Sequence, residues 1–114
     1  MKDDRLYLLH ISECLAKIER YVDGGREAFA KSDLIQDAVI RNLQTMAEST
    51  QRLSDAAKSC RPEVEWRKIA GFRNLLTHDY LSVDLDKVWE IIERELPDFK
   101  RAIEAMRQEN PPSV

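Results

Sequence analysis

Residues 73–80, Arg-Asn-Leu-Leu-Thr-His-Asp-Tyr, hold the side chains of this sequence that are best suited to chemistry, and we call them the octet. The guanidinium of Arg73 can bind a phosphate group through a planar fork of donors. The imidazole of His78 can accept or release a proton near neutral pH. A side chain that binds phosphate and a side chain that transfers protons are the minimum needed to cleave a phosphodiester without a metal ion. No other segment of the 114 residues concentrates reactive groups in this way.

The spacing within the octet limits how its two principal groups can meet. On an ideal helix Asn74 and His78 are four residues apart and share a face. Arg73 precedes His78 by five residues, so the two directions differ by about 140°. The pair therefore converges if the helix ends or is distorted near Thr77, and the following Asp79 favours such an ending. The pair also converges if a second copy of the chain brings its own octet across a two-fold axis.

If the two groups converge, the reaction they support is cleavage of RNA. One imidazole accepts the proton of a ribose 2′-hydroxyl or protonates the departing 5′-oxygen. Arg73 stabilises the charge that grows on the pentavalent phosphate. This reaction requires the 2′-hydroxyl, so the expected substrate is RNA, the product is a cyclic phosphate, and no metal or other cofactor is expected.

The same residues also permit a structural interpretation. Arg73 can form a surface ion pair with Glu65 or with Asp79. His78 can interact with the C-terminal end of a helix, where the helix dipole favours a positive charge. Tyr80 can be an aromatic side chain at the rim of the core with its hydroxyl in water. Residue types alone leave both interpretations open.

Helices are expected to position the octet, because apolar residues recur at intervals of three and four along most of the chain. No segment shows the alternation of a strand. We predict an all-α, antiparallel bundle of four main helices with one short additional turn. The predicted main helices cover residues 4–22, 33–59, 62–77 and 85–106, and the short turn covers 26–31. We expect a single helical domain over residues 1–109, followed by a disordered tail over residues 110–114.

Four residues within these helices call for an interpretation of their own. Pro97 interrupts the last helix and should kink it or split it in two. His10 lies among apolar neighbours in the first helix and is interpreted as structural. Arg41 and Glu48 are seven residues apart and share a face of the second helix. They form either a buried or interfacial polar cluster or a solvated pair.

Composition and charge exclude several classes of protein. The formal net charge is −3, which argues against a broad basic surface for duplex DNA, so any nucleic acid should be bound at a small local site. No apolar run is long enough for a membrane span, and the N-terminus does not resemble a signal peptide. We therefore expect a cytoplasmic protein with no membrane partner. Cys14 and Cys60 are too few for a metal motif, and no disulfide between them is expected.

The octet, followed by residues 81–84 and a long amphipathic helix, resembles the HepT-like branch of the HEPN superfamily. That superfamily is marked by an arginine, four to six residues, and a histidine. Arg73 and His78 match with four residues between them, and Asn74 supplies the polar residue that follows the arginine. Tyr80 matches a tyrosine found two residues after the histidine in the HepT branch. The resemblance extends over essentially the whole chain.

The resemblance implies a HEPN-like fold and a ribonuclease toxin of a type VII toxin–antitoxin module. It implies homodimers in which the paired motifs share a cleft. The implied partner is MntA, a minimal nucleotidyltransferase antitoxin that transfers AMP from ATP to the tyrosine matching Tyr80. A bulky anion at that position would block and repel the RNA phosphate. The catalytic residues implied are Arg73, His78 and Asn74, with Thr77 and Asp79 in supporting positions.

A non-enzymatic function also fits the sequence. The octet can hold nucleotide or RNA without cutting it, in a binding subunit that accompanies a minimal nucleotidyltransferase. The net negative charge and the lack of a broad basic face favour this alternative. A purely structural helical adaptor would require the composition of the octet to be accidental.

Overall fold

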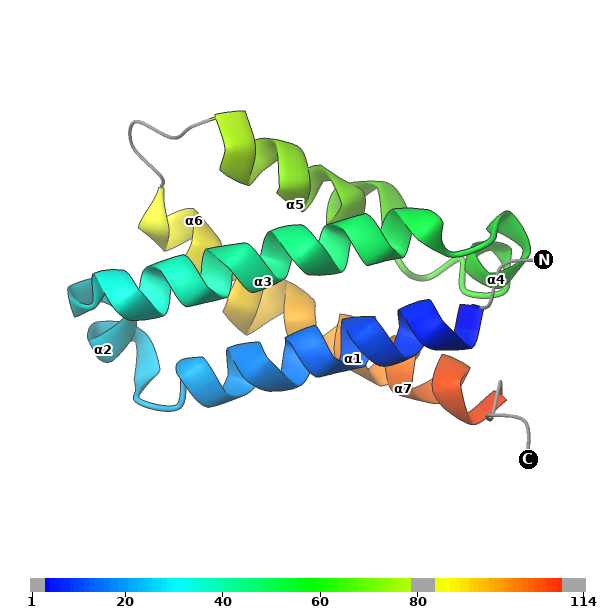
Figure 1. The fold of residues 1–114 in the computed structure, drawn as a ribbon, viewed down its shortest axis with the longest axis horizontal. Helices are drawn as coiled ribbons and strands as arrows, with labels where there is room; N and C mark the ends of the chain where they lie inside the picture. Colours follow the sequence, from blue (N-terminus) through cyan, green and yellow to red (C-terminus); the bar gives the residue numbers. More distant parts are fainter. Residues whose placement is uncertain (1–3, 79–83, 110–114) are drawn as a thin grey trace.

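The computed structural model describes residues 4–78 and 84–109, and of residues 74–78 it describes only the backbone. Every regular element in these ranges is helical, which confirms the predicted all-α class. The elements are α1 (Asp4–Tyr21), α2 (Gly25–Lys31), α3 (Asp33–Arg52), α4 (Asp55–Ser59), α5 (Trp66–His78), α6 (Leu85–Glu90), the π-helical segment η1 (Ile91–Glu95) and α7 (Leu96–Glu109). In Figure 1, α3 lies between α1 and α5, and the chain from α6 to α7 passes behind α3 in this view.

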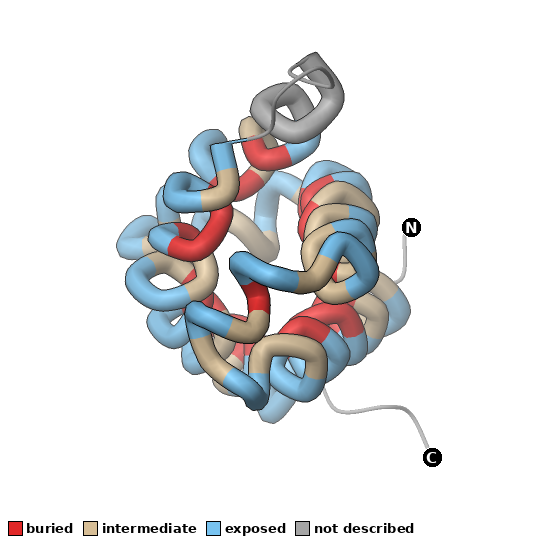
Figure 2. The backbone as a smooth tube through the Cα atoms, turned by 90° about the vertical axis from the view of Figure 1, so that its left-hand side faces the viewer, coloured by how far each residue is buried: buried red, intermediate tan, exposed pale blue. Residues whose placement is uncertain are grey.

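The core is built from the apolar stripes that the periodicity predicts. Most of its deeply buried members come from α1, α3 and α7, and they include Leu8, Ile11, Ile18, Val39, Leu43, Met46 and Ile103. Figure 2 shows the buried segments turned toward the inside of the bundle and the exposed segments on its outside. The short helix α2 joins this core through Phe29, whose ring centroid lies 5.4 Å from that of Trp89. The helices are therefore held mainly by burial of apolar surface.

The predicted extent of the second helix is wrong. The observed helix α3 ends at Arg52, whereas the prediction continued it to residue 59. Leu53 and Ser54 are both extended, and the separate helix α4 follows them. The hydroxyl of Ser54 accepts a hydrogen bond from the backbone N–H of Ala57 at 3.1 Å and so caps α4. The carboxylate of Asp4 in turn accepts bonds from the backbone N–H and the hydroxyl of Ser54, at 2.9 and 2.7 Å. These bonds offset the break in the helix.

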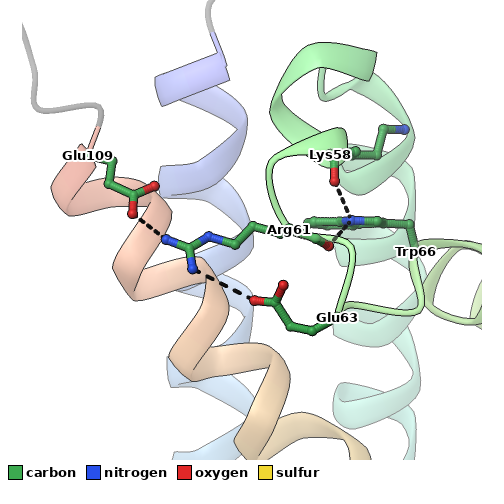
Figure 3. Close-up of polar contacts among 5 residues, drawn as sticks. All are labelled: Lys58, Arg61, Glu63, Trp66 and Glu109. Carbon is green, nitrogen blue, oxygen red and sulfur yellow. Dashed lines mark hydrogen bonds and ion pairs between the residues drawn. The ribbon is translucent and has the colours of Figure 1, made fainter.

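The start of the third helix was also predicted wrongly. α5 begins at Trp66, whereas Pro62 lies in the irregular segment that precedes it. The indole N–H of Trp66 donates to the carbonyls of Lys58 and Arg61, at 3.0 and 3.1 Å. The guanidinium of Arg61 pairs with Glu109 near the end of α7, as Figure 3 shows. These contacts fix the irregular segment against α7 and set where α5 starts.

The predicted interruption at Pro97 is present, but it takes the form of a widened turn. The chain stays helical from α6 through η1 into α7, and η1 is the π-helical part. The backbone N–H of Leu96 bonds to the carbonyl of Ile91, five residues earlier. A proline has no N–H to donate, and its ring crowds the carbonyl four residues before it. A π-helical turn before Pro97 therefore accommodates the ring without ending the helix.

Other predictions concern the C-terminal residues, the extent of the domain and the absence of a membrane span. Residues 110–114, expected to form a disordered tail, lie outside the described residues, and the assignment of residues 1–109 to one domain stays a prediction. Among the helices that are described, none combines the length and the apolar character needed to cross a bilayer.

Candidate active site

Helix α5 carries most of the octet and lies on α3 (Figure 1). Its inner face is apolar, because Ile69 and Phe72 are both buried in the core. The two helices run in opposite directions along their contact. Burial of this face fixes the rotation of α5 about its axis, and that rotation decides where each polar residue of the helix is placed.

Arg73 lies on the side of α5 that borders α3. Its Nε is 3.8 Å from Oε2 of Glu48, and the two side chains are about half exposed, at 49% and 55%. The suggested partner Glu65 instead forms an ion pair with Lys68 at 3.9 Å. Asp79, the other suggested partner, lies outside the described residues. The arginine of the octet is therefore held beside a carboxylate that comes from another helix.

The remaining residues of the octet are described only in part. The backbone of α5 is helical through Asn74 and Thr77 as far as His78, whereas the side chains of these residues, and the whole of Asp79 and Tyr80, lie outside the description. The helix therefore does not end before position 78. Five residues of regular helix separate positions 73 and 78 by about 140° around the axis. The backbone alone does not bring the two positions to one side of α5.

Glu48 was not among the predicted site residues, although the sequence contained a partial signal of it. Its position on the same face as Arg41 suggested a polar cluster on the second helix. Both residues are exposed, so a buried cluster is wrong. The contact between Glu48 and Arg73 joins residues 25 positions apart, and it depends on how far α5 is shifted along α3. Local spacing cannot supply that register.

The charge of α5 differs from that of the chain as a whole. Arg67, Lys68 and Arg73 lie on this helix, its sequence contains no carboxylate, and the full chain has a net charge of −3. Lys68 bonds to Glu95 of η1 at 2.7 Å, and this hydrogen bond raises the pKa of Lys68. Lys68 and Arg73 are each paired with a carboxylate from outside α5, so the excess of positive charge on the helix is small and local.

Two other chemically capable residues are structural. Nδ1 of His10 lies 2.5 Å from the hydroxyl of Ser49, and its Nε2 lies 3.9 Å from the sulfur of Cys14. Burial raises the pKa of the Cys14 thiol, which disfavours the thiolate needed for nucleophilic attack. Cys14 and Cys60 are both free thiols. Within the described ranges, no group of three or more metal-ligating side chains comes together.

Comparison with known proteins places these features in a family. The model of the family described as "Ribonuclease HepT-like" matches residues 11–106. This match spans most of the chain, and it includes both Glu48 and the octet. No solved structure matches the chain.

Several curated proteins are similar to the chain over most of its length. A protein of Caldanaerobacter subterraneus named "Putative RNase" is 33% identical over 95% of this chain and 97% of its own length. The "mRNA nuclease HepT" of Shewanella oneidensis is 27% identical over 87% of this chain and 92% of its own length. A protein of Methanocaldococcus jannaschii named "Gamma-glutamylcyclotransferase and putative RNase" is 32% identical over 95% of this chain. The match spans only 49% of that longer relative.

Proposed function

The chain belongs to the HepT-like ribonuclease family of the HEPN superfamily, and on that basis we propose that it cleaves RNA internally, without a metal ion, through Arg73 and His78. One observation supports the assignment of the activity to Arg73 and His78. Arg73 is held by Glu48 on a helix that contains no carboxylate and whose backbone continues to position 78. That arrangement offers a cation for a phosphate on the same helix as a residue able to transfer protons.

In the proposed reaction, an imidazole of His78 accepts the proton of a ribose 2′-hydroxyl. The 2′-oxygen attacks the neighbouring phosphorus and the bond from phosphorus to the 5′-oxygen breaks. The imidazolium that forms returns a proton to the departing 5′-oxygen, so the products are a 2′,3′-cyclic phosphate and a 5′-hydroxyl. Arg73 stabilises the extra negative charge on the phosphate oxygens, and Asn74 assists as a neutral donor.

Glu48 is a positioning residue in this proposal. A guanidinium has five donors in one plane, so a carboxylate beside Nε can fix that plane while the fork still reaches a phosphate. The distance of 3.8 Å between Arg73 Nε and Glu48 Oε2 supports this role. Glu48 also places a negative charge close to the expected position of the RNA, which should weaken binding of the substrate.

We propose further that two copies of the chain complete each site, with Arg73 from one copy and His78 from the other. The support is geometric, because positions 73 and 78 lie about 140° apart on a helix that continues to His78. A two-fold axis that brings two α5 helices together would place the arginine of each beside the histidine of its partner.

Control of the proposed toxin is assigned to Tyr80, which lies outside the described residues. We propose that an MntA-like nucleotidyltransferase transfers AMP to its hydroxyl in the cytoplasm. A bulky anion two residues after His78 would repel the phosphate of the substrate. Co-expression with such an antitoxin should raise the mass of the peptide that contains Tyr80 by AMP units. If co-expression with the antitoxin abolishes toxicity while Tyr80 remains unmodified, the proposed control through Tyr80 is contradicted.

The direct test is to incubate the purified protein with a defined RNA in EDTA. The proposal expects products with 2′,3′-cyclic phosphate ends, and expects Arg73→Ala and His78→Ala to lose this cleavage. Expression without an antitoxin should inhibit growth only when both residues are intact. Variants that cut RNA as well as the wild type would show that the active site was assigned wrongly. RNA that is bound but never cut would favour the binding-subunit alternative, which the net charge of −3 mildly supports.

A further inference from the structure

Helix α3 carries a line of polar residues along the side that borders α5. Glu48 lies 3.8 Å from Arg73 of α5, so this side of α3 faces the candidate site. Arg41 is seven residues before Glu48 and Arg52 is four residues after it, and both project within about 40° of Glu48 around the helix axis. Their positions are about 10 Å and about 6 Å from that of Glu48 along α3. We call Arg41, Thr45, Glu48 and Arg52 the α3 line.

The two arginines of the α3 line are not neutralised within the described part of the chain. Both are exposed, and among the described residues neither guanidinium takes part in an ion pair or a hydrogen bond. Asp37 is exposed one turn before Arg41 but forms no ion pair with it there. Thr45 adds no charge, and its hydroxyl donates to the carbonyl of Arg41 at 2.8 Å. The only carboxylate of the line, that of Glu48, is already occupied by a cation of α5. The line is therefore locally positive although the net charge of the chain is −3.

The α3 line borders the cleft that the proposed dimer would form. Arg73 can meet His78 of a second copy only if the side of α5 that carries Arg73 faces this cleft. Helix α3 lies along that same side, as the contact between Glu48 and Arg73 requires (Figure 1). The line therefore continues the wall of the cleft on both sides of Arg73, and a strand of RNA that reaches Arg73 passes along it.

We infer that Arg41 and Arg52 hold single-stranded RNA on either side of Arg73, each by contacting a phosphate that flanks the reacting one. This inference rests on the proposed ribonuclease function and names how its substrate is held. The line is about 16 Å long. That is longer than the rise between successive phosphates, about 3.4 Å in one strand of a duplex, so one strand can engage both arginines. Two cations without a partner beside the site complement a phosphate chain.

The first experiment measures binding and does not depend on cleavage. An RNA of about ten nucleotides with 2′-O-methyl groups cannot react through its 2′-oxygens, and its length is within the usual footprint of single-strand binding. Its affinity for the wild type, Arg41→Gln and Arg52→Gln is measured over a range of salt concentrations. Each variant should make the slope of log affinity against log salt shallower by at least about 0.7, the value for one phosphate contact. An unchanged slope in either variant would overturn the assignment of that arginine.

Lys17→Gln is the matched control for the loss of one positive charge. Lys17 is also exposed on a long helix, but it lies on α1, and α3 separates α1 from α5 (Figure 1). This variant should keep the salt slope of the wild type. A reduction equal to that of Arg41→Gln would mean that the net charge of the protein, and not the α3 line, sets the affinity, and would overturn the inference.

The second experiment separates binding of RNA from the chemical step. Cleavage of the unmodified ten-nucleotide RNA is compared with cleavage of a dinucleotide, whose single phosphate is the one that reacts. Arg41→Gln and Arg52→Gln should each raise KM for the longer RNA about fivefold and leave kcat unchanged, because a flanking contact binds substrate and transition state alike. Both variants should cut the dinucleotide with the kcat/KM of the wild type. An equal loss with both substrates would overturn the assignment to flanking phosphates.

The other possible partner of the two arginines is a second copy of the chain, which could offer them carboxylates. The mass of each variant in solution, measured at one fixed protein concentration, distinguishes this case. Arg41→Gln and Arg52→Gln should keep the mass and the urea midpoint of the wild type, because both side chains are exposed. Conversion of either variant to a monomer would overturn the inference. Failure of the wild type to cut either RNA would contradict the proposed function, and the salt slopes would still test the inference.

Discussion

The ion pair between Glu48 and Arg73 provides a quantitative test of how the active site is organised. The change is Glu48→Gln, which keeps the shape of the side chain and an acceptor oxygen but removes the charge. At the 3.8 Å that separates Arg73 Nε from Glu48 Oε2, the attraction is about 1 kcal/mol in water and about 4 kcal/mol at an effective dielectric constant of 20. The side chains are 55% and 49% exposed, so the lower figure applies.

Loss of this pair should therefore lower the free energy of unfolding by no more than about 1 kcal/mol, or about 4 °C in the melting temperature. The effect on cleavage should be divided between two constants. The KM for RNA should fall by up to about fivefold, because a negative charge near the phosphate is removed. The kcat should fall by about tenfold, because the guanidinium is no longer held in one orientation.

The assay combines urea unfolding at a fixed protein concentration with cleavage rates over a range of RNA concentrations. The matched control is Glu19→Gln, which removes a carboxylate that lies 2.8 Å from Lys100 and is similarly exposed, but joins α1 to α7. Glu19→Gln should lower the free energy of unfolding as little as Glu48→Gln does, and it should leave KM and kcat unchanged. A loss of more than about 2 kcal/mol in Glu48→Gln would make Glu48 a structural residue. An unchanged kcat would refute its positioning role.

Three further predictions concern the scaffold. Ser54→Ala removes the cap of α4 and the partner of Asp4, so urea unfolding should show a loss of about 1–2 kcal/mol; no loss would mean that the break after α3 does not need this cap. Leu43→Ala opens a cavity in the core and should cost about 2–5 kcal/mol in the same measurement, whereas a smaller cost would contradict tight packing there. Cys60 is exposed and should react with a maleimide more than about tenfold faster than Cys14, whose thiol pKa is raised by burial. Mass spectrometry of the labelled peptides measures both rates, and equal rates would contradict the prediction.

Periodicity predicted the main helices well because burial decides where they lie. The stripe through Ile11 and Ile18 of α1 faces the core as expected, and so does Leu43 of α3. The break at Ser54 could not be found in the same way, since the spacing of apolar residues continues across it. What ends α3 there includes hydrogen bonds to Asp4, fifty residues earlier in the sequence.

The candidate site shows the same division between local and long-range information. Arg73 and His78 stand out by type and spacing, which are properties of one short segment. Glu48 becomes a site residue only when α3 and α5 pack in one particular register.

The most direct test of the central claim mixes two inactive variants. If Arg73 of one copy and His78 of the other form each site, Arg73→Ala and His78→Ala should each fail to cut RNA. After exchange of subunits, about half of the dimers are mixed, and each has one intact site of its two. Cleavage in EDTA should then return to about one quarter of the wild-type rate. Mixed dimers that are detected by native mass spectrometry but remain inactive would contradict a shared site.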